Sequence, residues 1–300
     1  MSRKTKIWLI AAVCLILFGC IMLGGVMTML NWDFTKLSTH TYETNEYDIT
    51  DQYSGIFIST NTAEIALIPS ADGKTTVTCY EQQRVTHTVT VKDGALYIDV
   101  VDERKWHDYI GIHFGSPKIT VSLPAGQYDT LTLRTDTGAI DIPHGFQFEK
   151  MTVTQQTGSF TCRASTVGTM NIQTSTGVIR IENITADTLK LSISTGKTYL
   201  ENIACRTLES SGNTGGIIMK NVIAAEQLTV SRSTGDVRLE GCDAGNLSIT
   251  TATGEVSGSL LTEKTFITYS TTGRIDVPKT TAGGECRITT STGNIKITIP

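Results

Sequence analysis

The chain has 300 residues, with 25 Lys and Arg against 29 Asp and Glu, and a formal net charge of −4. A weakly acidic chain without a basic cluster is a poor nucleic-acid binder, because phosphate contacts need grouped Lys and Arg. Charged residues make up 18 % of the chain, and Gly is plentiful at 27 while Pro is scarce at 6, which excludes a disordered polyampholyte and a collagen-like chain.

A segment without any charge, residues 7–30, follows a short basic N-terminus. A helix of this length exceeds the ~30 Å hydrocarbon core of a bilayer and can span it with some tilt. Three basic residues precede the segment, whereas Asp33 is the first charge after it, so the positive-inside rule places residues 1–6 in the cytoplasm. We expect a single-pass cell-membrane protein that contacts the lipid bilayer through residues 7–30 and has its C-terminal domain outside the cell.

Two alternatives exist for this apolar segment. A cleaved signal peptide would have a shorter apolar region and a small-residue cleavage site. Leu17–Cys20 loosely resembles a lipobox, so lipid attachment at Cys20 is the second alternative, although Phe18 is bulky for such a site. The apolar run continues past both cleavage points, which favours the uncleaved anchor.

Residues 31–50 are polar and mildly acidic, and we expect them to form a stalk or linker. Residues 51–116 contain short runs of alternating apolar residues, such as Ser54–Thr60 and Ala95–Val100, which are typical of strands. Lys92–Gly94 predicts a turn between two of them. We interpret residues 51–116 as an atypical β region that caps the following repeats on the membrane side.

Nine Thr-Gly pairs define an internal repeat in residues 117–300, with 19 or 20 residues between successive glycines. Apolar and polar residues alternate on both sides of each pair, which predicts two short β-strands per repeat. The nine turn glycines are Gly138, Gly158, Gly177, Gly196, Gly215, Gly235, Gly254, Gly273 and Gly293.

A unit of this size with one apolar face cannot bury that face alone, whereas stacked units can. The sequence therefore predicts an all-β fold, a parallel β-solenoid of about 19–20 residues per coil, preceded by one transmembrane helix. Asn183, Asn202 and Asn221 occupy the same place in three repeats, as stacked turn amides would. An antiparallel propeller or sandwich is the alternative, but the repeats lack Asn-Gly and Asp-Gly hairpin signals.

The last repeat ends in a strand, residues 294–300, without a capping segment after it. An open parallel edge invites pairing with another chain. We expect this C-terminal coil to be a docking or self-association site, with Ile297 and Ile299 as partner-binding residues and a homo-oligomer as one outcome.

The most aromatic stretch outside the apolar segment lies between residues 104 and 114. We expect Trp106, His107, Tyr109 and Phe114 to contact a partner or lipid headgroups. A capping loop folded over the first coil is the alternative interpretation.

The sequence gives little support for a catalytic function. Asp236 and Glu255 are neighbouring carboxylates in the predicted outward rows, but no third joins them, and a solvated face of mixed charge is the simpler interpretation. His107 and His113 could join Asp108 at a metal, but a further ligand is not evident. Phosphate-loop, dinucleotide-binding and hydrolase motifs are absent. We predict a non-enzyme with no catalytic residue, no metal and no cofactor, and the seven cysteines show no disulfide framework.

The Ser-Thr-Gly units, an Ile68–Ser70 segment (Ile-Pro-Ser), a Val121–Pro124 lead-in (Val-Ser-Leu-Pro) and one preceding membrane span form a recognisable combination. It resembles the bacterial putative-adhesin domain of unknown function that is common in membrane-anchored Gram-positive proteins. The resemblance covers about residues 40–300. It implies a β-solenoid ectodomain at the cell surface and, in some members, proximity to envelope-stress systems; it implies no catalytic residues.

Three functional classes follow. The first is a non-catalytic, membrane-anchored module with adhesion-like binding of an envelope polymer or a protein. The second is an accessory or regulatory component of an envelope-stress sensing system, which would act through another membrane protein because only six residues are predicted to be cytoplasmic. The third is a carbohydrate-active enzyme, which the lack of convergent carboxylates disfavours.

Overall fold

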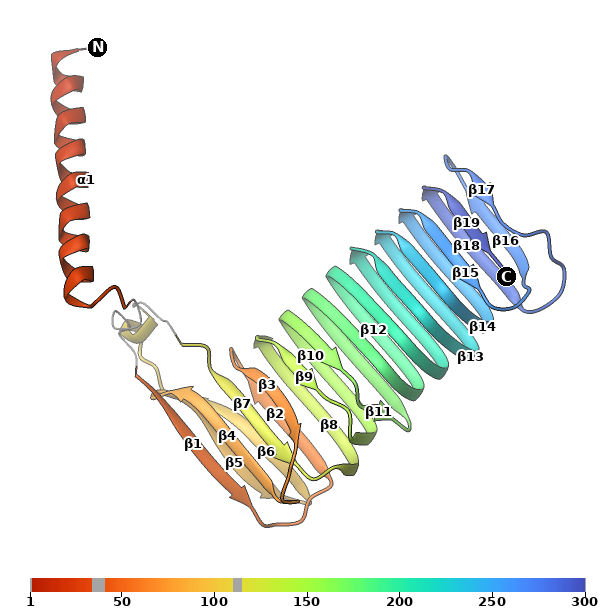
Figure 1. Cartoon of the computed structure of the whole chain (residues 1–300), viewed down its shortest axis with the longest axis horizontal. Coiled ribbons are helices and arrows are strands. Elements are labelled where there is room, and N and C mark those ends of the chain that lie inside the picture. Colours follow the sequence, from red (N-terminus) through yellow and green to blue (C-terminus); the bar gives the residue numbers. More distant parts are fainter. Residues whose placement is uncertain (1, 34–40, 110–114, 300) are drawn as a thin grey trace.

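The computed structural model describes residues 2–33, 41–109 and 115–299. Helix α1, Arg3–Met29, precedes one 19-stranded sheet, and a short 3₁₀ turn, η2 (Trp106–Tyr109), interrupts the strands. Figure 1 shows α1 standing outside the sheet. Helix α1 is long and apolar enough to cross a membrane, and its most apolar window is not buried. This is consistent with a single-pass anchor or a signal peptide.

The strands account for most of the described chain. Their bounds are β1 Tyr42–Ile49, β2 Gly55–Thr60, β3 Glu64–Pro69, β4 Thr75–Gln82, β5 Val85–Lys92, β6 Ala95–Asp102, β7 Lys118–Leu123, β8 Gly126–Thr137, β9 Ile140–Ile142, β10 Phe146–Cys162, β11 Ser165–Thr166, β12 Thr169–Thr214, β13 Ile217–Thr234, β14 Val237–Thr253, β15 Val256–Leu260, β16 Thr265–Ser270, β17 Ile275–Asp276, β18 Glu285–Thr292 and β19 Ile295–Thr298.

Successive turns of the chain pair in parallel from β8 to β14. Met151 of β10 lies opposite Met170 of β12, and Gly158 lies opposite Gly177. Strand β12 runs through its corners without interruption for 46 residues. Residues that occupy equal places in neighbouring Thr-Gly units are therefore neighbours in the sheet, and the turns are stacked side by side along the molecule (Figure 1).

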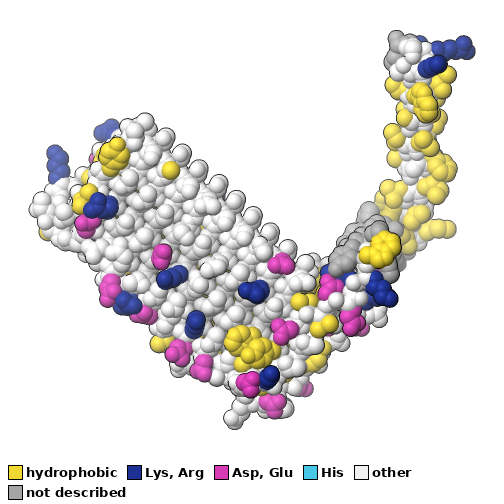
Figure 2. All heavy atoms as spheres, turned by 180° about the vertical axis from the view of Figure 1, so that it is seen from behind, with side chains coloured by type: hydrophobic (Ala, Val, Ile, Leu, Met, Phe, Trp, Pro, Cys, Tyr) yellow, Lys and Arg dark blue, Asp and Glu magenta, His cyan; other side chains and the backbone are white. Residues whose placement is uncertain are grey.

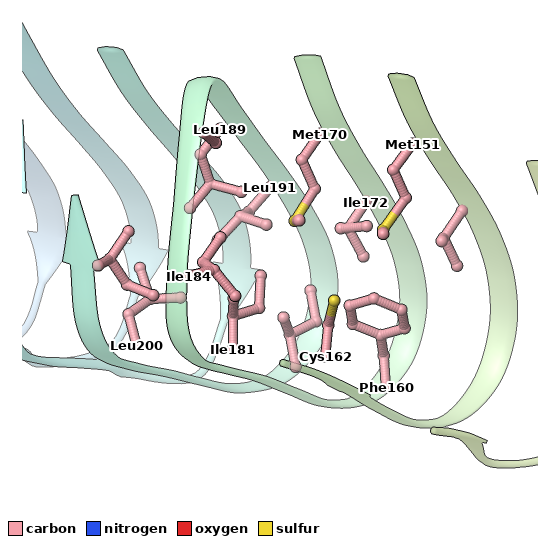
Figure 3. Close-up of a cluster of buried hydrophobic side chains, with 14 of the residues drawn as sticks. Met151, Phe160, Cys162, Met170, Ile172, Ile181, Ile184, Leu189, Leu191 and Leu200 are labelled. Carbon is pink, nitrogen blue, oxygen red and sulfur yellow. The ribbon is translucent and has the colours of Figure 1, made fainter. Parts of the chain in front are cut away.

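Alternate residues of every turn point inward and form one continuous core. Figure 3 shows Met151 and Met170 facing Phe160 and Cys162 across the interior, and all four side chains are fully buried. Burial of an apolar side chain of this size contributes about 1.5–3 kcal/mol. The row of inward residues therefore holds each turn against the next.

The Thr-Gly corners depend on a backbone that only glycine accepts easily. Gly196 has φ of 142°, and a Cβ added there would overlap the carbonyl oxygen of Gly177 in the preceding turn. A residue without Cβ is required for this approach of two backbones. The repeated glycine thus sets the spacing between turns.

A second corner is lined by an asparagine ladder, consisting of Asn183, Asn202 and Asn221. Their φ values are 56°, 55° and 52°, in the left-handed region that Asn tolerates better than most residues. The Asn202 side-chain amide donates to Asn183 Oδ1 at 2.8 Å, and the Asn221 amide donates to Asn202 Oδ1 at 3.0 Å. The amides link three turns at this corner.

Nine strands at the N-terminal end of the sheet close into a ring. The ring runs from β2 through β6, β5, β4, β7, β3, β9, β10 and β8 back to β2. The β4–β5, β5–β6 and β4–β7 pairs in the ring are antiparallel. Hairpin chemistry explains the β5–β6 pair, because Asp93 and Gly94 between these strands both have positive φ and such turns join antiparallel strands. The predicted fold class, a parallel β-solenoid, is therefore wrong for the sheet as a whole, which is mixed and closed at one end.

Part of the segment predicted as a stalk or linker forms a strand. Residues 42–49 form strand β1, which pairs antiparallel with β4 along its whole length. Strand β2 of the predicted cap pairs with both β6 and β8, so the cap and the repeats share one hydrogen-bonded sheet. The division into residues 1–6, 7–30, 31–50, 51–116 and 117–300 stays a prediction.

The last turns do not follow chain order. Strands β18 and β19 lie between the β14–β15 turn and the β16–β17 turn. The final turn buries Cys286, Ile288 and Ile295 completely, whereas Thr268 and Ser270 occupy inward positions of the β16 turn. The more apolar turn is thus the one enclosed, and β16–β17 is the outermost pair (Figure 1).

Candidate binding surface

The aromatic segment is only partly described. Trp106 begins η2 and has 78 % of its surface exposed. His113 and Phe114 lie outside the described residues, and of His107 and Tyr109 only the backbone is described. The binding role of these residues stays a prediction.

The two C-terminal candidates lie in the core rather than on an open edge. Ile297 is 2 % exposed, and Ile299 packs against the buried cluster. Exposed apolar side chains at this end come instead from the outermost strand, where Ile267 and Tyr269 have 41 % and 61 % of their surface exposed. The docking or self-association role of Ile297 and Ile299 stays a prediction.

The outer surface of the stacked turns is hollowed beside the Thr-Gly corners of its middle turns. The hollow has a volume of about 510 Å³, which is within the range of small-molecule sites. We call it the Gly216 hollow. Its ten lining residues are Lys197, Gly216, Ile217, Ile218, Thr234, Gly235, Asp236, Arg238, Thr253 and Gly254.

The hollow exists because one repeat has glycine where its neighbours carry side chains. Directly after the turn glycine, the adjacent turns carry Lys197 and Asp236, whereas this turn carries Gly216. A Cβ at Gly216 would lie 2.9 Å from the Asp236 carbonyl oxygen, so the next turn packs closely on bare backbone. Ile218 occupies an outward position two residues later and is 38 % exposed, so it supplies an apolar surface in the hollow.

Charged groups of both signs surround this apolar surface. Among the described residues, Lys197 has no ion-pair partner, while Arg238 Nε pairs with Glu240 Oε1 at 2.8 Å. Asp236 Oδ1 accepts the backbone N–H of Glu255 at 2.8 Å. The hollow therefore offers one unpaired cation and one carboxylate to a ligand. Figure 2 shows acidic and basic side chains interspersed over the stacked turns seen from behind, in agreement with a solvated face of mixed charge.

An aromatic ring extends the hollow along the same outward row. Tyr199 lies opposite Ile218 in the adjacent turn, and the Arg180 guanidinium carbon is 4.6 Å from the centroid of its ring. A cation stacked on a tyrosine face fixes both side chains. The ten lining residues include Thr, Lys and Asp but no Ser, Cys or His.

Sequence reasoning missed this site. The outward rows predict a solvated face of mixed charge, although two signals mark the position. One is the double glycine Gly215–Gly216, and the other is the apolar Ile218 in an outward row of polar residues.

Solved structures of low sequence identity share the fold. A putative lipid binding protein from Parabacteroides distasonis is 16 % identical with a TM-score of 0.55, covering 87 % of this chain and 98 % of its own. A putative adhesin from Parabacteroides merdae is 13 % identical with a TM-score of 0.53, covering 87 % and 98 %. A putative adhesin from Bacteroides fragilis is 18 % identical with a TM-score of 0.50, covering 86 % and 97 %.

No curated protein matches the chain. The Toastrack DUF4097 family matches residues 53–221 and 200–300, which together span most of the strands. The chain therefore belongs to the Toastrack DUF4097 family, a domain of unknown function.

Proposed function

We propose that this chain is a non-catalytic, adhesion-like binding module that holds an envelope polymer or a protein at the membrane surface. The observation that carries the proposal is the Gly216 hollow, in which the exposed Ile218 lies among the charged Lys197 and Asp236. Family membership and the shared fold with proteins named putative adhesins agree with a binding role.

The same proposal assigns α1 as an uncleaved anchor with residues 31–300 outside the cell. Its support is the basic N-terminus before the apolar segment and Asp33 after it. A membrane-impermeant protease added to intact cells should degrade the strand region and leave α1 in the membrane. Protection of the strand region in intact cells, with degradation only after lysis, would reverse the orientation.

Binding is tested with the full-length chain in detergent and envelope fragments from the cells that produce it. Ile218→Asp and Lys197→Ala should each weaken sedimentation with the fragments at least tenfold, because they alter the apolar surface and the unpaired cation of the hollow. Ile223→Asp is the matched control, since Ile223 lies in the same strand with the same 38 % exposure but outside the hollow. Equal binding by all three variants contradicts the assignment of this hollow.

Cross-linking in intact cells distinguishes the binding module from the envelope-stress alternative. Cross-links to wall fragments or to a protein that disappear in Lys197→Ala support the binding module. A membrane-protein partner that cross-links equally well in Lys197→Ala favours the envelope-stress alternative.

A further inference from the structure

Three buried side chains with metal-ligating atoms meet where β4 and β5 adjoin. They are Cys79 and Glu81 of β4 and His87 of β5, and their Sγ, carboxylate oxygen and ring nitrogen all lie within 4.8 Å of one another. Cys79 and Glu81 are two residues apart on a strand, so they share its inward face. The short β4–β5 turn brings His87 back to the same place.

The surroundings orient each of these groups. His87 Nδ1 lies 2.7 Å from Glu81 Oε2, and His87 Nε2 lies 2.9 Å from Thr60 Oγ1. Asn45 donates from its side-chain amide to the other carboxylate oxygen of Glu81 at 2.7 Å. His87 Nδ1 and Glu81 Oε2 thus face each other within 4.8 Å of the Cys79 Sγ, while His87 Nε2 and the other Glu81 oxygen are held by Thr60 and Asn45.

Charge balance makes a divalent cation suitable at this position. Glu81 is completely buried and Cys79 is too, and a buried carboxylate is costly unless it is compensated. Among the described residues, His87 is the group at ion-pair distance from Glu81, and an imidazole carries a positive charge only when it is protonated. A thiolate and a carboxylate together neutralise a divalent metal, with neutral imidazole as a third ligand.

We propose that Cys79, Glu81 and His87 bind one Zn²⁺-type divalent ion. Mixed sulfur, nitrogen and oxygen ligands suit zinc, at about 2.3 Å from sulfur and about 2.0–2.2 Å from nitrogen and oxygen. The metal takes the place of the Glu81–His87 hydrogen bond at Nδ1. Thr60 then accepts from Nε2–H, and Asn45 holds the outer carboxylate oxygen, as outer partners of metal ligands commonly do. A water molecule or small anion supplies the fourth ligand.

Such a site would stabilise the ring of nine strands where the pairing between neighbouring strands is shortest. Strands β4 and β5 share the single register pair Gln82↔Val85, whereas β5 and β6 are paired along their length. Because two ligands come from β4 and one from β5, the metal links strands that hydrogen bonds barely connect. All three ligands are buried, so the ion has a structural role.

The test uses the full-length protein in detergent, with Cys14 and Cys20 of α1 replaced by Ala so that they do not bind the probe. After treatment with a chelator, the protein is titrated with Co²⁺. One equivalent per chain should produce a thiolate-to-Co²⁺ charge-transfer absorption, which Zn²⁺ then abolishes. Loss of the metal should increase hydrogen exchange in β5 more than in β12.

Two variants locate the site. Cys79→Ser should abolish the thiolate absorption, while Cys286→Ser should keep it, because Cys286 is equally buried in a distant turn. If Cys79→Ser does not fold, the site is tested by X-ray absorption of the Zn²⁺-loaded protein in which Cys14 and Cys20 are replaced by Ala. We expect one sulfur ligand at the zinc. A folded protein that gives no thiolate absorption, a zinc spectrum without sulfur, or an absorption unchanged by Cys79→Ser overturns the proposal and leaves a metal-free hydrogen-bonded cluster.

Discussion

Gly212 lies directly opposite Arg232 in the adjacent turn, and the bare backbone of Gly212 leaves room for the Arg232 side chain. A Cβ at Gly212 would lie 3.0 Å from the Ile193 carbonyl oxygen and 3.2 Å from Arg232 Cδ and Cζ. Arg232 is 2 % exposed and donates to the carbonyl oxygen and the hydroxyl of Ser210 at 3.1 and 2.8 Å. Burial lowers the pKa of Arg232 to about 10. The two residues thus form a small–large pair inside the core.

We predict that Gly212→Val and Arg232→Thr are energetically coupled. Gly212→Val should cost about 2 kcal/mol in the wild type, because it overpacks the core against Arg232 and the Ile193 carbonyl oxygen. In the Arg232→Thr background the cost should fall by about 1 kcal/mol or more, since the new methyl groups occupy space that the guanidinium has left. Denaturant unfolding of the four proteins measures the coupling, and additive costs would contradict the pairing.

The register of the stacked turns follows from features that a sequence displays. The Thr-Gly spacing aligns Met151 with Met170, and these residues are neighbours in the sheet. The asparagines that occupy equal places, such as Asn183 and Asn202, share a hydrogen bond. Both results rest on a local pattern that repeats, so each copy supports the next.

The closed ring and the order of the last turns could not be predicted from a repeated sequence pattern. The ring depends on antiparallel pairing of β4, β5 and β6, which belongs to a part of the chain without repeats. The β16 and β18 turns both carry a Thr-Gly corner, so their order depends on which turn buries more apolar surface. Cys79, Glu81 and His87 likewise come together only through the β4–β5 turn, and no ligand spacing along the chain marks them.

The asparagine ladder gives a prediction about backbone strain. Asn202→Ala should lower the free energy of unfolding by about 2 kcal/mol, because Ala resists positive φ and the two amide hydrogen bonds disappear. Asn202→Gly should cost about 1 kcal/mol, since Gly tolerates this backbone and loses only the hydrogen bonds. Asn171→Ala serves as a control outside the ladder and should change stability by under about 0.5 kcal/mol. A larger cost for Gly than for Ala would exclude the strain argument.

A buried ion pair near the far end should matter more than an exposed one. Lys264 Nζ lies 2.7 Å from Asp243 Oδ1, with side-chain exposures of 5 % and 16 %. Asp243→Asn should cost about 3 kcal/mol, because it leaves the Lys264 ammonium buried without its counter-charge. The matched exposed pair joins Lys220 and Glu201 at 2.9 Å, and Glu201→Gln should cost under about 1 kcal/mol. Thermal unfolding of both variants compares them, and equal shifts in Tm would contradict the difference.

The buried thiols predict a loss of stability at alkaline pH. Desolvation by burial raises the pKa of Cys162 and of Cys286 to about 12, from an ordinary value near 9. The folded state therefore keeps protons that the unfolded state loses, so the stabilising contribution is complete below pH 9 and is lost as the pH rises toward 12. Each thiol should steepen the fall of the unfolding free energy by about 1.4 kcal/mol per pH unit in this range.

Replacement of Cys162 by Ala isolates this effect. The variant is less stable at pH 8 because it loses buried volume, but its unfolding free energy should fall less steeply between pH 9 and pH 11 than that of the wild type. The difference in slope, measured by denaturant unfolding at several pH values with a reductant present, reports the Cys162 thiol alone. Parallel slopes for the two proteins would mean that the Cys162 thiol ionises equally in the folded and unfolded states, against the burial that the structure gives it.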